Sequence, residues 1–317
     1  MDKRHWTGVF AAITTPFRDD FSVDHDFLAA HVQWLVENGC SGIVALGSLG
    51  ESSTLAFEEK SAILATCRDV LDDGVPLVAG VAGLSTHECV HLAKRAADEG
   101  CDGLMVLPPY VYRGDDRETE SHFSAVLEAT PLSCMLYNNP IAYGTDVTPA
   151  QLERLARHEN LHAVKESSGD ARRVTAVTER LDSRLAVFAG MDDMILESIP
   201  MGAVGWIAGL VNALPAESVA LFDLGRGGRW EQARDLYEWF LPLLRLDTLP
   251  KFVQAIKLVQ AELGCGVTHV RPPRLPLTGE ELDATLDLIR QQLSARPAGI
   301  ESSRLRGTNR TRTARAV

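Results

Sequence analysis

The sequence has little of what would indicate a disulfide framework, a zinc site or secretion. Its 317 residues include only six cysteines, and no two of them form a C-x-x-C pair, so neither a disulfide framework nor a zinc site is indicated. The cysteines lie in apolar segments, which is typical of buried free thiols in a reducing cytoplasm. The N-terminal MDKRHWTGVF also lacks the apolar segment of a signal peptide. We therefore expect a cytoplasmic protein.

Long uncharged runs and basic charge are also scarce. The longest uncharged run, between Glu197 and Glu217, spans 19 residues, which is nominally enough to cross a membrane. Its glycines and prolines instead divide it into turn, strand and loop. The chain has 31 basic and 43 acidic residues and a net charge of −12, whereas a nucleic-acid-binding protein usually has a basic surface. We expect neither a membrane nor a nucleic acid as partner.

The basic charge is uneven along the chain. Residues 296–317 contain six arginines and one glutamate and have no apolar periodicity. Such a composition cannot bury enough apolar surface to fold. We predict a disordered basic tail over residues 294–317.

What the sequence does contain is a repeated alternation of short apolar runs and helical patterns. Most of the runs are continuously apolar, as expected for parallel strands covered on both faces. Ser85 and Glu88, between two runs, have the spacing of a capping box. The eight runs begin at Gly8, Gly42, Pro76, Asp102, Leu132, Leu161, Leu185 and Ala203.

Eight strand–helix units predict an α/β fold, a (β/α)8 TIM barrel over residues 6–226. The alternative is a doubly wound open sheet, but no G-x-G-x-x-G turn follows the first run. After residue 226 the pattern becomes purely helical, near 229–246, 249–264 and 279–293. No Gly/Ser linker precedes these segments. We therefore predict that residues 227–293 are a three-helix extension of one catalytic unit.

Active sites of such barrels lie at the C-terminal ends of the strands, and one lysine stands out there. The chain has six lysines, and only Lys165 lies inside a predicted strand. A buried lysine is rare unless it is paired, so Lys165 either pairs with an acid such as Glu166 or is a functional amine. Burial would lower its pKa from about 10.4 towards about 7–8. A neutral amine can attack a ketone and form a Schiff base.

Schiff-base chemistry also needs groups that carry protons. Tyr137 ends the preceding strand and can reach the Lys165 amine, while Ser48 offers a hydroxyl at another strand end. The alternatives are a core aromatic and an ordinary turn serine. The turn Gly47-Ser48-Leu49-Gly50 can also bind a carboxylate through its backbone N–H groups. It lacks the lysine of a phosphate-binding loop, which favours a small carboxylate over a nucleotide.

Two further strand ends carry polar side chains. Tyr110 follows the fourth run, and the pair Asp192-Asp193 follows the seventh. No histidine lies near that pair at a ligand spacing, so helix N-capping is favoured over metal binding. We predict no metal site.

Three motifs occur at mutually consistent spacings: GSLGES from Gly47, LYNNP from Leu136 and VKESSGD from Val164. On these motifs, residues 6–293 resemble the dihydrodipicolinate synthase / N-acetylneuraminate lyase family of class I Schiff-base aldolases. The resemblance implies a lyase without metal or cofactor and a homotetramer built from tight dimers. It implies that Lys165 forms an imine with a 2-oxo acid, usually pyruvate, and that Tyr137 and Ser48 move protons. The implied substrate-binding residues are Gly47, Leu49, Tyr110, Gly190 and Ile207.

Three departures from the synthase pattern affect the half of the site that takes the second substrate. Leu49 stands where synthases have a second hydroxyl residue. Ala142 stands where they have an arginine that grips a carboxylate, a bidentate interaction that alanine cannot make. Val111 replaces a tyrosine that crosses the dimer, although the neighbouring Tyr112 can substitute for it. These differences argue against a true lysine-pathway synthase.

The stretch LYNNPIAYGT resembles that of pyrroline-4-hydroxy-2-carboxylate deaminases. We therefore expect a Schiff-base lyase that cleaves or dehydrates a 2-oxo acid, with this deaminase reaction as one form. The alternatives are a dihydrodipicolinate synthase, a 4-hydroxy-2-oxoglutarate or sugar-acid aldolase or dehydratase, and a phosphate-binding sugar barrel. From another class, a non-catalytic 2-oxo acid sensor is disfavoured because a binding pocket does not need both Lys165 and Tyr137.

Overall fold

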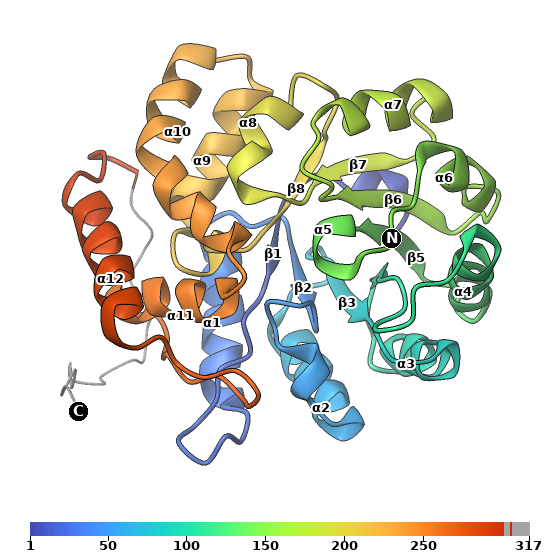
Figure 1. Cartoon of the computed structure of the whole chain (residues 1–317), viewed down its shortest axis with the longest axis horizontal. Helices are drawn as coiled ribbons and strands as arrows, with labels where there is room; N and C mark the ends of the chain where they lie inside the picture. The colour runs from blue at the N-terminus through green and yellow to red at the C-terminus, as the bar shows by residue number, and fades with distance from the viewer. Residues whose placement is uncertain (301–304, 306–317) are drawn as a thin grey trace.

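Eight parallel strands close into a barrel in the order of the sequence, β1 to β8, which confirms the predicted (β/α)8 fold (Figure 1). The computed structural model describes residues 1–300 and residue 305. The strands are β1 (Gly8–Ala12), β2 (Gly42–Ala45), β3 (Leu77–Val81), β4 (Gly103–Val106), β5 (Ser133–Asn138), β6 (Leu161–Glu166), β7 (Ala186–Ala189) and β8 (Gly205–Ala208).

Helices surround the strands, and further helices follow β8 (Figure 1). The barrel helices are α1 (His25–Glu37), α2 (Phe57–Val70), α3 (Thr86–Asp98), α4 (Asp116–Glu128), α5 (Pro140–Tyr143), α6 (Pro149–Leu155), α7 (Arg172–Leu181), α8 (Ile195–Ser198) and α9 (Pro215–Arg226). Then come α10 (Trp230–Leu244), α11 (Phe252–Glu262) and α12 (Gly279–Ser294). Short 3-10 turns are η1 (Lys3–His5), η2 (Ser52–Thr54), η3 (Asp192–Met194), η4 (Leu210–Asn212) and η5 (Arg245–Thr248).

Most of the strand residues are apolar because both faces of the sheet are buried, and the polar exceptions are on β5 and β6. One face points into the barrel, where Trp6, Phe10 and Phe188 pack with ring centroids 5.4–6.0 Å apart. The other face packs against the surrounding helices. The predicted capping box also forms: Ser85 Oγ accepts from the Glu88 N–H at 3.2 Å, and the Glu88 carboxylate accepts from the Ser85 N–H at 3.3 Å. The six cysteines are buried and unpaired, as predicted.

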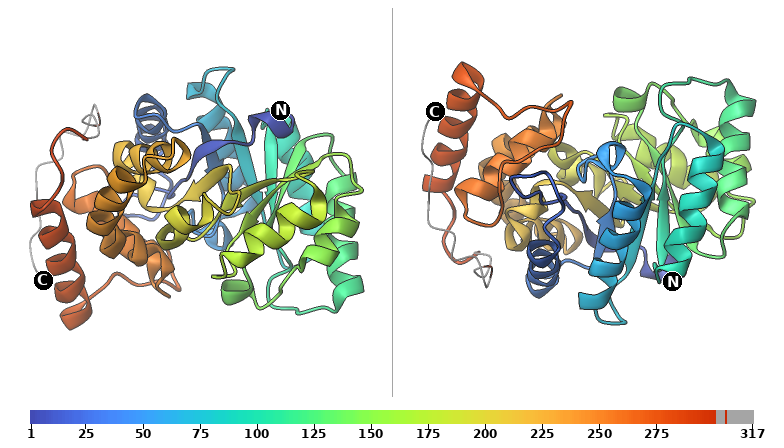
Figure 2. Two further views of the ribbon diagram at one scale, coloured as in Figure 1. Left: turned by 90° about the horizontal axis from the view of Figure 1, so that it is seen from above. Right: turned by 90° about the horizontal axis from the view of Figure 1, so that it is seen from below.

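Helices α10, α11 and α12 lie together on one flank of the barrel, with α12 outermost (Figure 2). Of the predicted tail, residues 301–304 and 306–317 lie outside the described residues. In its first part, the Arg296 guanidinium pairs with the buried Glu217 carboxylate. None of the described helices is both long and apolar enough to span a membrane.

A buried ion pair joins this flank to the turn after β2. Lys257 Nζ of α11 donates to Glu51 Oε1 at 2.6 Å, and both side chains are almost wholly buried. The Arg271 N–H donates to the other carboxylate oxygen at 3.0 Å. Glu51 adopts a left-handed conformation with φ of 56°, which is uncommon for a residue other than glycine. The ion pair therefore holds an unfavourable backbone conformation next to Ser48.

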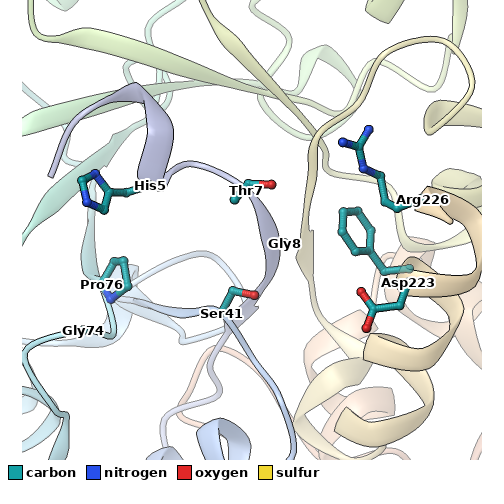
Figure 3. A pocket seen from close by; sticks show the side chains of 9 residues that line it. His5, Thr7, Gly8, Ser41, Gly74, Pro76, Asp223 and Arg226 are labelled. Carbon is teal, nitrogen blue, oxygen red and sulfur yellow. The ribbon is translucent and has the colours of Figure 1, made fainter.

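A cavity of 370 Å³ lies at the opposite end of the barrel from the C-terminal strand ends (Figure 3). Gly8 begins β1, and Ser41 and Pro76 directly precede β2 and β3, so the cavity is at the N-terminal ends of the strands. In barrels this end serves stability rather than catalysis. Its lining residues are His5, Thr7, Gly8, Ser41, Gly74, Pro76, Phe222, Asp223 and Arg226.

Replacing Lys257 with methionine would remove the nearer of two cations from the buried Glu51 carboxylate, leaving Arg274 at 3.7 Å. We expect the free energy of unfolding to fall by about 3–5 kcal/mol, measured by urea denaturation. The matched control is Lys251→Met, which breaks a half-exposed pair with Glu281 and should cost at most about 1 kcal/mol. Equal losses in the two variants would contradict a special role for the buried pair.

Candidate active site

Lys165 lies near the C-terminal end of β6, directly opposite Tyr137 in the register of β5 and β6. The lysine is only 7% exposed, and its Nζ is 4.2 Å from the centroid of the Tyr137 ring. The alternative pairing with Glu166 is not seen: that carboxylate accepts instead from the Asn138 side chain and the Ser168 N–H. Burial lowers the pKa of Lys165 to about 8, although Asp247 and Asp192 partly oppose the shift.

Gly190 follows β7 and leaves room for the lysine. A Cβ at this position would lie 2.8 Å from both Cε and Cγ of Lys165 and would overlap the Ser167 hydroxyl. The glycine also fixes the backbone, because its N–H donates to the Glu166 carbonyl at 2.9 Å. The predicted pocket residue Gly190 is thus placed against the stem of Lys165.

Tyr137 lies among aromatic hydroxyl groups at the same end of the barrel. Its ring is 5.7 Å from that of Tyr143, which is 5.5 Å from that of Tyr110. The Asn139 amide donates to the Tyr137 hydroxyl at 2.9 Å. Burial raises the pKa of Tyr137 to about 12, opposed by this hydrogen bond. Burial also raises the pKa of Tyr110 and of Tyr143, so all three phenols are protonated at neutral pH.

The Ser48 hydroxyl joins this group by a short contact with the Tyr143 hydroxyl. Tyr143 ends α5, a one-turn helix capped by the Asn139 side chain, begun by Pro140 and stopped by Gly144 with φ of 72°. This asymmetry of proline at the start and glycine after the end is typical of helix termini. Tyr143 was not among the predicted site residues, because its contact with Ser48 joins positions 95 residues apart.

The turn that carries Ser48 presents unpaired backbone donors. The Glu51 N–H donates to the Ser48 carbonyl at 3.1 Å, and Thr15 Oγ1 donates to the Gly50 carbonyl at 2.7 Å. By contrast, the N–H groups of Ser48 and Leu49 donate no hydrogen bond within the part of the chain that the structure describes. Adjacent free N–H groups of this kind can bind an anion.

The two remaining predicted pocket positions lie on other strands. Ile207 is on β8, opposite Phe10 of β1, and its side chain is buried inside the barrel. Gly47 directly precedes Ser48, and a Cβ there would meet only the Met105 methyl group, at 3.7 Å. The structure therefore puts Ser48, Tyr110, Tyr137 and Lys165 at one end of the barrel, with Ile207 in its interior.

Helix N-capping was predicted for Asp192-Asp193, and the pair does not cap the segment that it begins. Asp192 accepts from Trp206 Nε1 at 2.9 Å and from the N–H groups of Gly209 and Leu210 at 3.0 and 2.8 Å. It therefore satisfies donors at the start of η4, because the closed barrel brings the end of β7 beside the end of β8. Burial raises the pKa of Asp192 to about 6, against the effect of these hydrogen bonds.

Two more residues near the site were missed by the sequence analysis. Asp247 of η5 lies against Gly209, where a Cβ would be 2.6 Å from the Asp247 Cγ. The Arg113 guanidinium lies against Gly144, where a Cβ would be 2.6 Å from its Nη2. Both approach from segments without a recognisable motif. Among the described residues, no group of three or more histidine, cysteine or acidic side chains is placed to hold a metal.

Comparison with known proteins gives the same fold and one family. Residues 5–292 match the Dihydrodipicolinate synthetase family. A 4-hydroxy-tetrahydrodipicolinate synthase of Methanothrix thermoacetophila is 34% identical over 274 residues, which cover 86% of this chain and 92% of that protein.

Two solved structures have the same architecture. The synthase of Methylacidiphilum fumariolicum SolV superposes with a TM-score of 0.86 and 30% identity, covering 91% of this chain and 97% of that one. The chloride-inhibited dihydrodipicolinate synthase of Acinetobacter baumannii, complexed with pyruvate, has a TM-score of 0.86 and 29% identity over 90% of this chain and 98% of that one.

Gly190→Ala should displace the Lys165 amine because the new methyl group overlaps the space of its stem. We expect the yield of a borohydride-reduced pyruvate adduct on Lys165 to fall, and stability to fall by about 1–3 kcal/mol from overpacking. Peptide mass analysis and thermal unfolding measure the two effects. Gly74→Ala is the control, since a Cβ at Gly74 meets nothing within 4 Å. A wild-type adduct yield in Gly190→Ala would refute this placement.

Proposed function

Because the chain belongs to the Dihydrodipicolinate synthetase family, and is thus a lyase of the aldolase type, we propose that it acts on a 2-oxo acid through a Schiff base on Lys165. The observation that carries this proposal is a buried amine whose pKa is lowered to about 8. At pH 7 about a tenth of such an amine is neutral, against a far smaller fraction of an ordinary lysine. The neutral fraction attacks the C2 carbonyl.

Tyr137 is suited to move protons in the steps that follow attack. Its raised pKa keeps the phenol protonated at neutral pH, and its ring lies next to the Lys165 amine. The contact between Ser48 and Tyr143 brings two more hydroxyl groups to the same end of the barrel. We assign proton transfer to Tyr137 and proton relay to Ser48. Tyr143 is an additional member of this cluster of hydroxyl side chains.

The free N–H groups of Ser48 and Leu49 are our candidates for binding the carboxylate of the 2-oxo acid. Backbone donors bind an anion without a charged side chain, which suits a small substrate in a mouth lined by tyrosines. Gly47, Tyr110, Gly190 and Ile207 are proposed as the remaining walls. The Acinetobacter baumannii relative is described as complexed with pyruvate, which supports a substrate of this class.

For the second half of the substrate we propose the reaction of a pyrroline-4-hydroxy-2-carboxylate deaminase. In this reaction the ring hydroxyl leaves as water, and hydrolysis of the cyclic imine releases ammonia, so that one water molecule is consumed overall. Ala142 is exposed on α5 and offers no charge where the synthase pattern has an arginine. Arg113, whose guanidinium lies against Gly144 at the end of the same helix, is our candidate for a cation near this position. The alternative is the activity named for the relatives, 4-hydroxy-tetrahydrodipicolinate synthase.

We also propose that the chain assembles as a homotetramer of tight dimers. Near the site, three large side chains are exposed: Val111 at 92%, Tyr112 at 60% and Ile141 at 68%. Val111 has φ of 68°, which is unfavourable for a β-branched residue. An apolar surface of this kind at a barrel mouth is typical of a subunit contact.

Incubation with pyruvate and borohydride should leave a reduced adduct on Lys165, identified by peptide mass. The rate of trapping should rise with pH through about 8, because attack needs the neutral amine and burial lowers the pKa of Lys165 to about 8. Lys165→Ala should give no adduct, whereas Lys94→Ala, which removes an exposed lysine of α3, should behave as wild type. No adduct with pyruvate or with a panel of 2-oxo acids would exclude the proposed chemistry.

Tyr137→Phe removes the proposed proton-transfer group. In this variant the rate of pyruvate trapping or of turnover should fall about 10²–10⁴-fold.

The substrate is tested by turnover of hydroxyproline-derived cyclic imines, sugar-derived 2-oxo acids and sialic acid under the same conditions. We expect the cyclic imine to be consumed with release of ammonia, measured by a coupled ammonia assay. Condensation of pyruvate with the aldehyde substrate of the synthases is the comparison reaction. A faster condensation than deamination would favour the synthase alternative and rule out the deaminase assignment.

A further inference from the structure

The turn that carries the free N–H groups of Ser48 and Leu49 is oriented by the two residues that follow it. The Ser52 N–H donates to the Gly47 carbonyl at 3.4 Å, and the Glu51 N–H donates to the Ser48 carbonyl at 3.1 Å. Each of these carbonyls shares a planar trans peptide with one of the two free N–H groups, which points in the opposite direction. Fixing the two carbonyls therefore fixes the direction of the two donors.

Both hydrogen bonds depend on the backbone conformation of Glu51, which has φ of 56° and ψ of 31°. This left-handed conformation is disfavoured for a residue with a side chain, so surrounding contacts must maintain it. Two of these contacts are made to the backbone: Thr15 Oγ1 donates to the Gly50 carbonyl at 2.7 Å, and the Thr54 N–H donates to the Glu51 carbonyl at 2.8 Å. The rest of the restraint comes from the Glu51 side chain, which is buried beside cations.

The Glu51 carboxylate is anchored by the last part of the chain. Lys257 Nζ of α11 donates to its Oε1 at 2.6 Å, and the Arg271 N–H donates to its Oε2 at 3.0 Å. Arg274 Nη1 lies 3.7 Å from the same Oε2. A carboxylate without access to water must keep such partners. The anchored side chain therefore holds the Glu51 backbone where both turn hydrogen bonds form.

Lys257 is itself held in one position. Its side chain is only 2% exposed. Its Nζ also donates to the His269 carbonyl at 2.6 Å and lies 4.6 Å from the centroid of the Phe17 ring. A buried ammonium with fixed partners on several sides has no alternative position that would satisfy its donors. The ion pair therefore links the position of α11 to the conformation of the turn.

We propose that the ion pair between Lys257 and Glu51 positions the free N–H groups of the turn and so sets the affinity for the carboxylate of the 2-oxo acid. This inference rests on the proposed function, in which those N–H groups bind the carboxylate. Lys257 is 206 positions from Glu51 in the sequence, and it is a positioning residue because it acts through that glutamate. Its loss should weaken recognition of the carboxylate and leave the reactivity of the Lys165 amine unchanged.

The test uses three variants that separate the ion pair from the burial of charge. Lys257→Met removes the nearer cation from Glu51. The double variant Glu51→Gln/Lys257→Met removes the ion pair without leaving a buried carboxylate that has lost its lysine, and such neutral replacements are often well tolerated. Arg296→Gln is the matched control, because it removes a cation from another buried carboxylate, that of Glu217 on α9, and leaves the Glu51 ion pair intact.

The measurement is the rate of borohydride trapping on Lys165 against the concentration of pyruvate and of acetone, with the adduct located by peptide mass. Acetone has the same ketone group but no carboxylate. In both variants that lack the ion pair, the half-saturating concentration of pyruvate should rise about 10-fold, as for the loss of a hydrogen bond to a charged group. The rate with acetone should remain near the wild-type value. Arg296→Gln should behave as wild type with both compounds.

The outcomes separate this inference from the proposed function. No pyruvate adduct on Lys165 in the wild type would refute the Schiff-base function and the inference with it. A wild-type adduct with an unchanged half-saturating concentration in the double variant would refute only the positioning role. An equal loss of trapping with pyruvate and acetone, or an equal change in Arg296→Gln, would also refute it, because the effect would then be a general disturbance of the fold. If Lys257→Met does not fold, the double variant decides the matter.

Discussion

The site depends on a primary amine that is buried away from water while nearby acidic groups still stabilise its charged form. Lys165 lies 4.2 Å from an aromatic face, and its stem needs the missing side chain of Gly190. Burial alone would make the amine a poor cation and a good nucleophile. The acidic groups Asp192 and Asp247 oppose that shift, so the pKa stays near neutral pH. The closed barrel makes this balance possible by bringing the ends of separate strands together.

The sequence was sufficient for the features that depend on local pattern. Continuous apolar runs predicted the strands because a barrel strand is buried on both faces, and β1 to β8 follow the predicted runs. Lys165 stood out because a charged residue inside such a run is costly. The capping box at Ser85 and Glu88 was also predicted, since it depends on a spacing of three residues.

The sequence was not sufficient where a side chain finds its partner across the barrel. Asp192 resembles an N-cap in sequence, yet its donors lie 14 to 18 residues away on β8 and η4. Tyr143 contacts Ser48, which is 95 residues earlier. Asp247 reaches Gly209 from beyond the barrel strands. Neither the periodicity nor the spacing of residues contains this information, because these contacts depend on which strand ends become neighbours in the closed barrel.

The ion pair between Lys257 and Glu51 connects residues 206 positions apart, and this separation has a consequence for synthesis. A ribosome makes the turn with Ser48 and all eight strands before it makes Asp247 and Lys257. A nascent chain that ends after α9 contains all eight strands but lacks the cation of the Glu51 carboxylate, because Lys257 is on α11. Such a chain contains Lys165 but not Asp247, whose negative charge opposes the lowering of the Lys165 pKa. The order of translation therefore delays completion of the site until the last helices have left the ribosomal tunnel.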